Sequence, residues 1–100
     1  MLFMIIERYR DPDAVYARFK SKGRMLPAGL EYISSWVSND LKTCWQLMET
    51  ANPALFDNWT SKWDDIVDFE IVKVLTSKEA QAATTKRGRK PKIKVIKDRE

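Results

Sequence analysis

The sequence predicts an α+β domain in which two helices cover one face of a four-stranded antiparallel sheet. Three observations predict it. The N-terminus begins with a continuous apolar run over residues 2–6, which is typical of a central strand buried on both faces. An Asp-Pro pair at residues 11–12 and an Asn-Pro pair at residues 52–53 are typical of helix starts. Residues 29–50, between the two predicted helices, alternate in the manner of two paired strands.

The first helix follows from its start signal and its apolar spacing. Asp11 can accept hydrogen bonds from free backbone N–H groups, and proline suits the first helical position. Val15, Tyr16 and Phe19 then recur at helical spacing. Gly23 is a typical C-terminal stop, so we expect the helix to end there.

The stretch of residues 29–50 predicts a hairpin whose two-residue turn is Asn39-Asp40, because both residue types tolerate left-handed backbone. This turn places Trp36 opposite Thr43 and Ser34 opposite Trp45. One face then gathers the larger apolar side chains and is predicted to be the core face: Leu30, Tyr32, Trp36, Leu41, Trp45 and Leu47. The other face mixes apolar and polar residues: Ile33, Val37, Cys44 and Met48 with Glu31, Ser35, Lys42 and Gln46.

The second helix and the last strand complete the domain. Leu55, Phe56, Trp59 and Trp63 form an apolar helical stripe that ends near residues 64–65. Residues 66–75 alternate as a strand whose apolar residues are interrupted by charges, which is typical of an edge strand. The order strand, helix, strand, strand, helix, strand is that of the ferredoxin-like fold.

The two helices can cover only one face of the sheet, yet the first, second and fourth strands carry apolar residues on both faces. The sequence therefore predicts a homodimer that pairs sheet to sheet as an α+β barrel.

Charge divides the chain into two parts. Residues 1–76 have a net charge of −2, and residues 77–100 have a net charge of +6. We therefore expect a folded domain over residues 1–76 and a basic, flexible tail over residues 77–100. The chain has no His and a single cysteine, so it can form no intrachain disulfide and offers no cysteine cluster for zinc. We expect neither a metal nor another cofactor.

No segment has the length of a membrane span, and the N-terminal apolar run is too short for a signal peptide. These observations predict a cytoplasmic protein with no membrane partner.

The tail has its own motif. After a small, polar stretch over residues 77–85, expected to be a linker, the chain reads KRGRKPK. This resembles the AT-hook, in which a glycine lets two arginines lie in a narrow minor groove, although Lys90 here separates Arg89 from Pro91. The candidate DNA- or RNA-binding residues are Lys86, Arg87, Gly88, Arg89, Lys90 and Lys92. Nonspecific binding driven by counterion release is favoured over sequence reading, and a merely solubilising tail is the alternative.

Three segments, MLFMIIERYRDPDAVYARF, GRMLPAGLEYISSWVSNDLKTCWQLMET and NWTSKWDDIVDFEIVKV, resemble a family of small bacterial proteins. It is the domain-of-unknown-function family numbered three-three-zero-three, which is placed with the dimeric α+β barrels. The resemblance covers about residues 1–76 and brings no established activity. The wider superfamily implies that any enzyme here resembles cofactor-free monooxygenases or isomerases. Its haem-degrading members use a His ligand, which this chain lacks.

The candidate ligand-binding residues are aromatic and hydroxyl side chains expected between the helices and the sheet: Tyr32, Ser34, Trp36, Trp45 and Trp59. A pocket of this kind is apolar with a few polar groups, but aromatic residues at these spacings are more often core. Cys44 has no His to activate it and is expected to be buried and inert. Asp64 and Asp65 are expected in a solvated turn. Anion binding is open to three arginines at element ends, Arg8, Arg10 and Arg24, but ordinary surface charge is the favoured interpretation.

Three functions remain open from the sequence. In the first, the domain binds, or acts on, a small apolar molecule. In the second, the dimer pairs two tails for nucleic-acid binding. In the third, the protein is a structural or regulatory dimer with a protein partner. The first is favoured for the domain.

Overall fold

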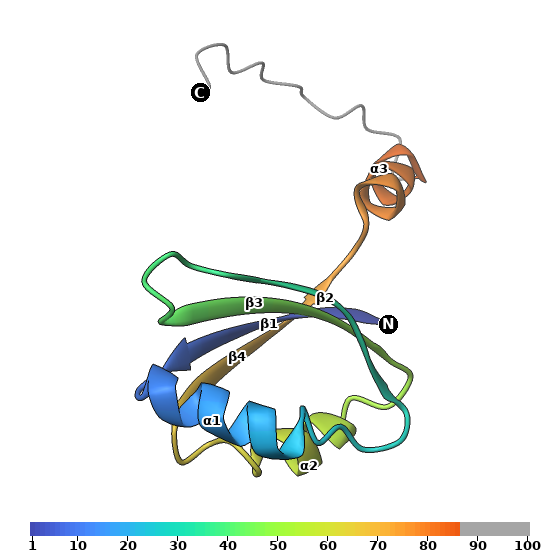
Figure 1. The fold of residues 1–100 in the computed structure, drawn as a ribbon. Coiled ribbons are helices and arrows are strands. Elements are labelled where there is room, and N and C mark those ends of the chain that lie inside the picture. The colour runs from blue at the N-terminus through green and yellow to red at the C-terminus, as the bar shows by residue number, and fades with distance from the viewer. Residues whose placement is uncertain (87–100) are drawn as a thin grey trace, which may run out of the picture.

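A computed structural model describes residues 1–86 of the chain and has the predicted fold class. The elements are β1 (Leu2–Tyr9), α1 (Pro12–Lys22), β2 (Leu30–Val37), β3 (Thr43–Thr50), α2 (Leu55–Thr60), β4 (Val67–Val74) and α3 (Ser77–Lys86). The four strands form one antiparallel sheet in the order β2-β3-β1-β4. The first strand is therefore central and the last one is an edge strand, as predicted. Figure 1 shows α1 and α2 together on one face of this sheet.

The core lies between these two helices and the sheet. Trp59 and Trp63 are buried there, as the helical stripe predicted, with Ile5 and Met48 of the two central strands beneath them. Aromatic rings meet at close range, with the ring centroids of Phe3 and Phe56 5.0 Å apart. Burial of such large side chains is the main stabilising contribution in a domain of this size.

The β2–β3 hairpin differs from the predicted one in its loop. Trp36 pairs with Trp45, not with Thr43, because a four-residue loop replaces the two-residue turn. The hydroxyl of Ser38 donates to the Asp40 carboxylate at 2.7 Å and accepts from the backbone N–H of Thr43 at 3.1 Å. Leu41 takes the left-handed backbone conformation, with φ of 64°. The loop is thus closed by side-chain hydrogen bonds that a turn-propensity argument does not anticipate.

The predicted core face of the hairpin is wrong. On β3, the side chains buried toward the helices are Cys44, Gln46, Met48 and Thr50. Trp45 and Leu47 lie on the opposite face, where Trp36 joins them.

A β-bulge in β2 explains the error. Tyr32 pairs with Met48 but Ser34 pairs with Leu47, so Ile33 is the extra residue. A bulge reverses the alternation of the strand, and Leu30 therefore faces the helices although Trp36 does not.

We call the face of the sheet away from α1 and α2 the open face. Its apolar side chains come from all four strands: Leu2, Met4, Ile6, Trp36, Trp45, Leu47, Val72 and Val74. The side chain of Trp36 is 55% exposed and that of Trp45 is 37% exposed. In Figure 1 no helix of residues 1–86 packs on this face, and α3 lies beyond the end of β4. The apolar second face that the sequence predicted is thus present.

Helix α1 begins as predicted. The backbone N–H of Ala14 donates to the Asp11 carboxylate at 3.1 Å, and Pro12 follows the cap. At the other end, the backbone N–H of Gly23 donates to the carbonyl of Phe19 at 2.7 Å, and Gly23 has a φ of 68°. The free N–H groups and carbonyls at both helix ends are thereby partly satisfied.

We expect Asp11→Ala to lower the free energy of unfolding by about 1 kcal/mol, because the cap hydrogen bond is lost. Urea denaturation measures this change. Asp13→Ala is the matched control, since Asp13 lies in the first turn of α1 without a cap bond and contributes only through the helix dipole, a few tenths of a kcal/mol. Equal losses in the two variants would show that charge, not capping, matters here.

Helix α2 is shorter than predicted, and the third helix, α3, was not predicted. Helix α2 ends at Thr60, and turns lead from there to β4. Residues 77–86 form α3, where a linker was expected. The start of α3 is a capping box: the Glu79 carboxylate accepts from the backbone N–H of Thr76 at 2.9 Å, and the Thr76 hydroxyl accepts from the N–H of Glu79 at 3.0 Å.

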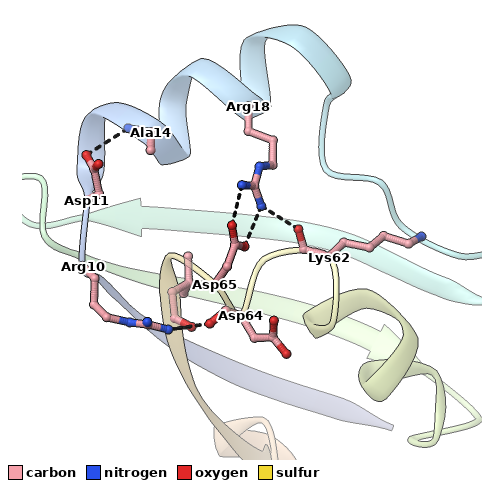
Figure 2. Close-up of polar contacts among 8 residues, drawn as sticks. Arg10, Asp11, Ala14, Arg18, Lys62, Asp64 and Asp65 are labelled. Atoms are coloured by element: carbon pink, nitrogen blue, oxygen red, sulfur yellow. Dashed lines mark hydrogen bonds and ion pairs between the residues drawn. The ribbon is translucent and has the colours of Figure 1, made fainter.

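Polar contacts fix α1 to the connection between α2 and β4, as Figure 2 shows. The Arg18 guanidinium donates to both carboxylate oxygens of Asp65 at 2.8 Å each and to the carbonyl of Lys62 at 2.8 Å. The hydrogen bonds from Arg18 lower the pKa of Asp65 to about 2. Arg10 donates to the carbonyl of Asp64. Asp65 is exposed, as expected for this turn, and it holds the helix over the sheet.

Candidate functional site

A cavity of about 150 Å³ lies between the helices and the sheet. Its wall is mainly aromatic and aliphatic, with several polar groups converging on it: Glu7, Tyr9, Val15, Tyr16, Phe19, Arg24, Ser35, Val37, Cys44, Gln46, Trp59, Trp63 and Phe69. Tyr16 and Phe19 of α1 and Val37 of β2 are exposed, so the cavity opens to solvent between these two elements. A dry cavity of this size holds one benzene-sized molecule.

Glu7 is a carboxyl group in the core. It follows Phe3 and Ile5 on the buried side of β1, and its side chain is only 5% exposed. The side-chain amide of Gln46 donates to its carboxylate. Burial raises the pKa of Glu7 to about 7, although the hydrogen bonds from Gln46 and Tyr9 and the charge of Arg24 act in the opposite direction. Glu7 therefore holds its proton to a higher pH than an exposed carboxyl group does.

Arg24 closes one side of the cavity from the α1–β2 connection. Its Nε donates to Oε1 of Gln46 at 2.9 Å, so Gln46 links it to Glu7. Its guanidinium carbon lies 3.6 Å from the ring centroid of Tyr32 and 5.1 Å from that of Phe19. Among residues 1–86, its two terminal NH₂ groups make no hydrogen bond or ion pair.

The two cavity tryptophans hold Arg24 in place through its backbone. The indole N–H of Trp59 and that of Trp63 donate to the Arg24 carbonyl at 3.0 Å and 3.2 Å. One carbonyl thus satisfies both buried indole groups. The next residue, Met25, has a φ of 60°, and its carbonyl accepts from Nζ of Lys62 at 3.0 Å. The connection carrying Arg24 is therefore fixed to α2 and the turns that follow it.

The remaining titratable groups of the cavity stay protonated. Burial, followed by the charge of Glu7, raises the pKa of the Cys44 thiol to about 11. Burial likewise raises the pKa of Tyr9 and that of Tyr16 above the usual value of a phenol. Cys44 is buried and free, as expected, and its raised pKa makes it a poor nucleophile. The two phenols remain hydrogen-bond donors.

The five predicted ligand-binding residues do not lie together. Trp59 forms part of the cavity wall. Tyr32 stacks on Arg24, and its hydroxyl lies 2.8 Å from that of Ser35, but Tyr32 is outside the wall. Ser34, Trp36 and Trp45 lie on the open face.

Sequence reasoning did not find Glu7, and it considered Arg24 for anion binding only as the less favoured alternative to ordinary surface charge. For Glu7 a signal was present: an acidic residue continues the buried alternation of Phe3 and Ile5. For Arg24 the signal was only its place at the end of an element, shared with Arg8 and Arg10, because the fold alone brings the α1–β2 connection over Gln46.

Several predictions concern other parts of the chain. Helix α3 ends at Lys86, while Arg87, Gly88, Arg89, Lys90 and Lys92 lie outside the described residues. Nucleic-acid binding by the tail stays a prediction. Within residues 1–86, no three His, Cys, Asp or Glu side chains gather as a metal site. None of the helices in this part of the chain has the length and apolar character needed to span a membrane.

The fold and the cavity define a small ferredoxin-like α+β protein whose pocket is lined mainly by aromatic side chains and carries a few polar groups. The chain belongs to the family described as Domain of unknown function (DUF3303), whose model matches residues 1–88. The family resemblance drawn from the sequence is thereby confirmed, and the match includes α3. No curated protein and no solved structure shows significant similarity to the chain.

Proposed function

We propose that this protein is a homodimer in which each protomer binds a small, mainly apolar molecule in the cavity between its helices and its sheet. The observation that supports ligand binding is the composition of the cavity wall. Aromatic and aliphatic side chains supply most of it, and Glu7, Gln46 and Arg24 supply polar groups at one side. Small-molecule sites are typically apolar with a few placed polar groups.

The size and the polar groups narrow the ligand class. A volume of about 150 Å³, in a cavity that opens to solvent, suits a small aromatic molecule of one ring or two fused rings. Trp59, Trp63 and Phe69 offer ring faces and edges for aromatic contacts. The terminal NH₂ groups of Arg24 are suited to an oxygen substituent, and they favour a carboxylate or a phenolate. The proposed ligand is therefore a small aromatic or conjugated molecule with an oxygen atom at one end.

The open face supports the homodimer. It exposes apolar side chains from four adjacent strands, and contiguous apolar patches on soluble proteins commonly mark interaction sites. A second copy presents the same apolar surface, and isologous pairing of identical patches is the commonest form of oligomer. Sheet-to-sheet packing would also leave the cavity accessible, because the cavity lies on the other face.

A pair of neighbouring serines tests the location of the ligand. Ser35 lines the cavity and Ser34 lies on the open face of the same strand. We expect Ser35→Leu to weaken the binding of indole or benzoate at least tenfold, because the larger side chain occupies the cavity. Ser34→Leu is the matched control and should leave binding unchanged. Ligand-observed NMR with each probe measures the dissociation constants.

Native mass spectrometry of protein purified without added ligand gives an independent test. Retained small-molecule mass that is lost in Ser35→Leu would support the proposal and identify the ligand. If both serine variants bind the probes like the original chain, the cavity is not the binding site.

A further inference from the structure

We propose that Glu7 is a catalytic proton acceptor: its carboxylate removes a proton from a small aromatic or conjugated ligand whose oxygen atom is held by Arg24. This inference deepens the proposed function and rests on ligand binding in the same cavity. It is carried by the arrangement of three side chains along one side of the cavity. Glu7 and Arg24 contact the same Gln46 amide, one on its nitrogen and the other on its oxygen.

The surroundings of Glu7 fit this role better than a purely structural one. A buried carboxylate in a stable core is normally neutralised by a direct ion pair. Within the described residues, Glu7 forms none, and Arg24 binds Gln46 instead of the carboxylate. The groups facing Glu7 are Tyr9 on its own strand, Cys44 and Gln46 on β3, Tyr16 on α1 and Arg24. Only Arg24 among them is charged at neutral pH.

The cavity also places the two charged groups where a ligand can meet both. Glu7 and Arg24 are both part of its wall, together with apolar side chains such as Trp59 and Phe69. A ligand ring lying against Trp59 and Phe69 would direct its reacting edge toward the polar side. Fixing the reactant and the base in one geometry supplies much of the rate gain in such reactions.

The proposed step needs no co-reactant. The C–H bond of the ligand breaks, its proton goes to the Glu7 carboxylate, and the electron pair moves through the conjugated system to the oxygen atom. The resulting oxyanion lies against the Arg24 guanidinium, and the neutral Glu7 then returns the proton to another atom of the ligand. Such a step changes the position of a hydrogen atom and a double bond with no net oxidation. General-base catalysis by a side chain contributes about 10²–10⁴-fold to a rate.

A nitro-substituted benzisoxazole is a suitable probe for this step. Removal of its ring C–H proton breaks the N–O bond, forms a nitrile and releases a coloured phenolate, so one base produces one product without any co-reactant. The full chain should convert the probe with a rate that rises with pH and has its midpoint near the pKa of Glu7, about 7. A midpoint near the ordinary lysine value of about 10 would assign the reaction to surface amines and overturn the proposal.

Glu7→Gln should lower the rate at least tenfold, because the amide keeps the shape of the side chain but cannot accept the proton. Glu31→Gln is the matched control: it makes the same substitution at an exposed carboxylate of β2 and should leave the rate unchanged. Thermal unfolding of each variant verifies that it is folded. An unchanged rate in a folded Glu7→Gln overturns the proposal.

Arg24→Gln distinguishes the role of Arg24, which holds the oxygen atom of the ligand, from that of Glu7, which accepts the proton. The positive charge of Arg24 lowers the pKa of Glu7, so its removal should move the pH midpoint upward as well as slow the reaction. An unchanged midpoint would remove Arg24 from the mechanism.

Binding of indole, measured on the same samples, distinguishes the two proposals. If indole binds but the probe reacts equally in Glu7→Gln, proton transfer fails and ligand binding stands. If the cavity binds neither indole nor benzoate, both proposals fail.

Discussion

Val72→Asp is expected to convert the proposed homodimer into monomers. Val72 pairs with Met4 on the open face, which is the surface proposed to meet its copy. In the dimer the new carboxylate would be buried without a partner on either side of the two-fold axis. Leaving a buried charge unpaired costs about 3–5 kcal/mol. Since about 1.4 kcal/mol corresponds to a tenfold change in affinity, the dissociation constant should rise at least 100-fold. Sedimentation velocity over a concentration series measures it.

The neighbouring residue provides a matched control. Ile71 precedes Val72 on the same edge strand and has the same exposure of 39%, but it lies on the face of the helices, opposite Ile5. Ile71→Asp introduces the same charge at the same depth and should leave the dimer intact. If both variants dissociate equally, general destabilisation and not the open face is responsible. If the original chain is itself monomeric at micromolar concentration, the proposed pairing is wrong.

The order of the elements was predictable because each one has a local signal. The apolar run of β1 indicates a strand buried on both faces, and β1 is central in the sheet. The Asp11 cap with Pro12 and the stop at Gly23 gave both ends of α1. The charges that interrupt β4 indicated an edge strand. These signals depend on a few consecutive residues, so the sequence contains all the information they need.

The faces of the hairpin were not predictable for the opposite reason. A single bulge at Ile33 and a four-residue loop decide which side chains face the helices. Both hairpin faces carry apolar residues, because the open face is apolar too, so hydrophobic alternation cannot choose between them. The larger aromatic residues, Trp36 and Trp45, made the wrong face look like the core.

The candidate site was only partly predictable for a related reason. Trp59 was found because it belongs to a helical stripe that must be buried. Glu7 and Arg24 acquire their properties from contacts between segments far apart in the chain. A carboxyl group has an ordinary pKa until a fold removes its water, and a sequence read locally does not show that removal.

The second large effect expected is on the pH dependence of stability, through Glu7→Gln. The pKa of Glu7 is about 7 in the folded chain, above the ordinary value of 4.5 that applies in the unfolded chain, so the folded state binds the proton more tightly than the unfolded state. The contribution of Glu7 to the free energy of unfolding is therefore most favourable below pH 4.5, and it falls as the pH rises to about 7. The raised pKa corresponds to about 3 kcal/mol. In Glu7→Gln this loss should be absent, and the variant should gain about 3 kcal/mol relative to the original chain between pH 4.5 and pH 8.

Urea denaturation at a series of pH values, at one protein concentration, tests this expectation. Comparing the variant with the original chain at each pH cancels the contributions of the other carboxyl groups. Asp65 has a pKa of about 2, so its titration affects stability only at lower pH. Cys44, with a pKa of about 11, ionises above this range. Asp13→Asn should follow the original chain within a few tenths of a kcal/mol, since Asp13 is an exposed carboxylate on α1, away from the open face. If the free energy of unfolding of Glu7→Gln also changes with pH as that of the original chain does, the fold does not disfavour the ionised form of Glu7. The polar side of the cavity would then be a permanently charged anchor, suited to holding a cation instead of accepting a proton.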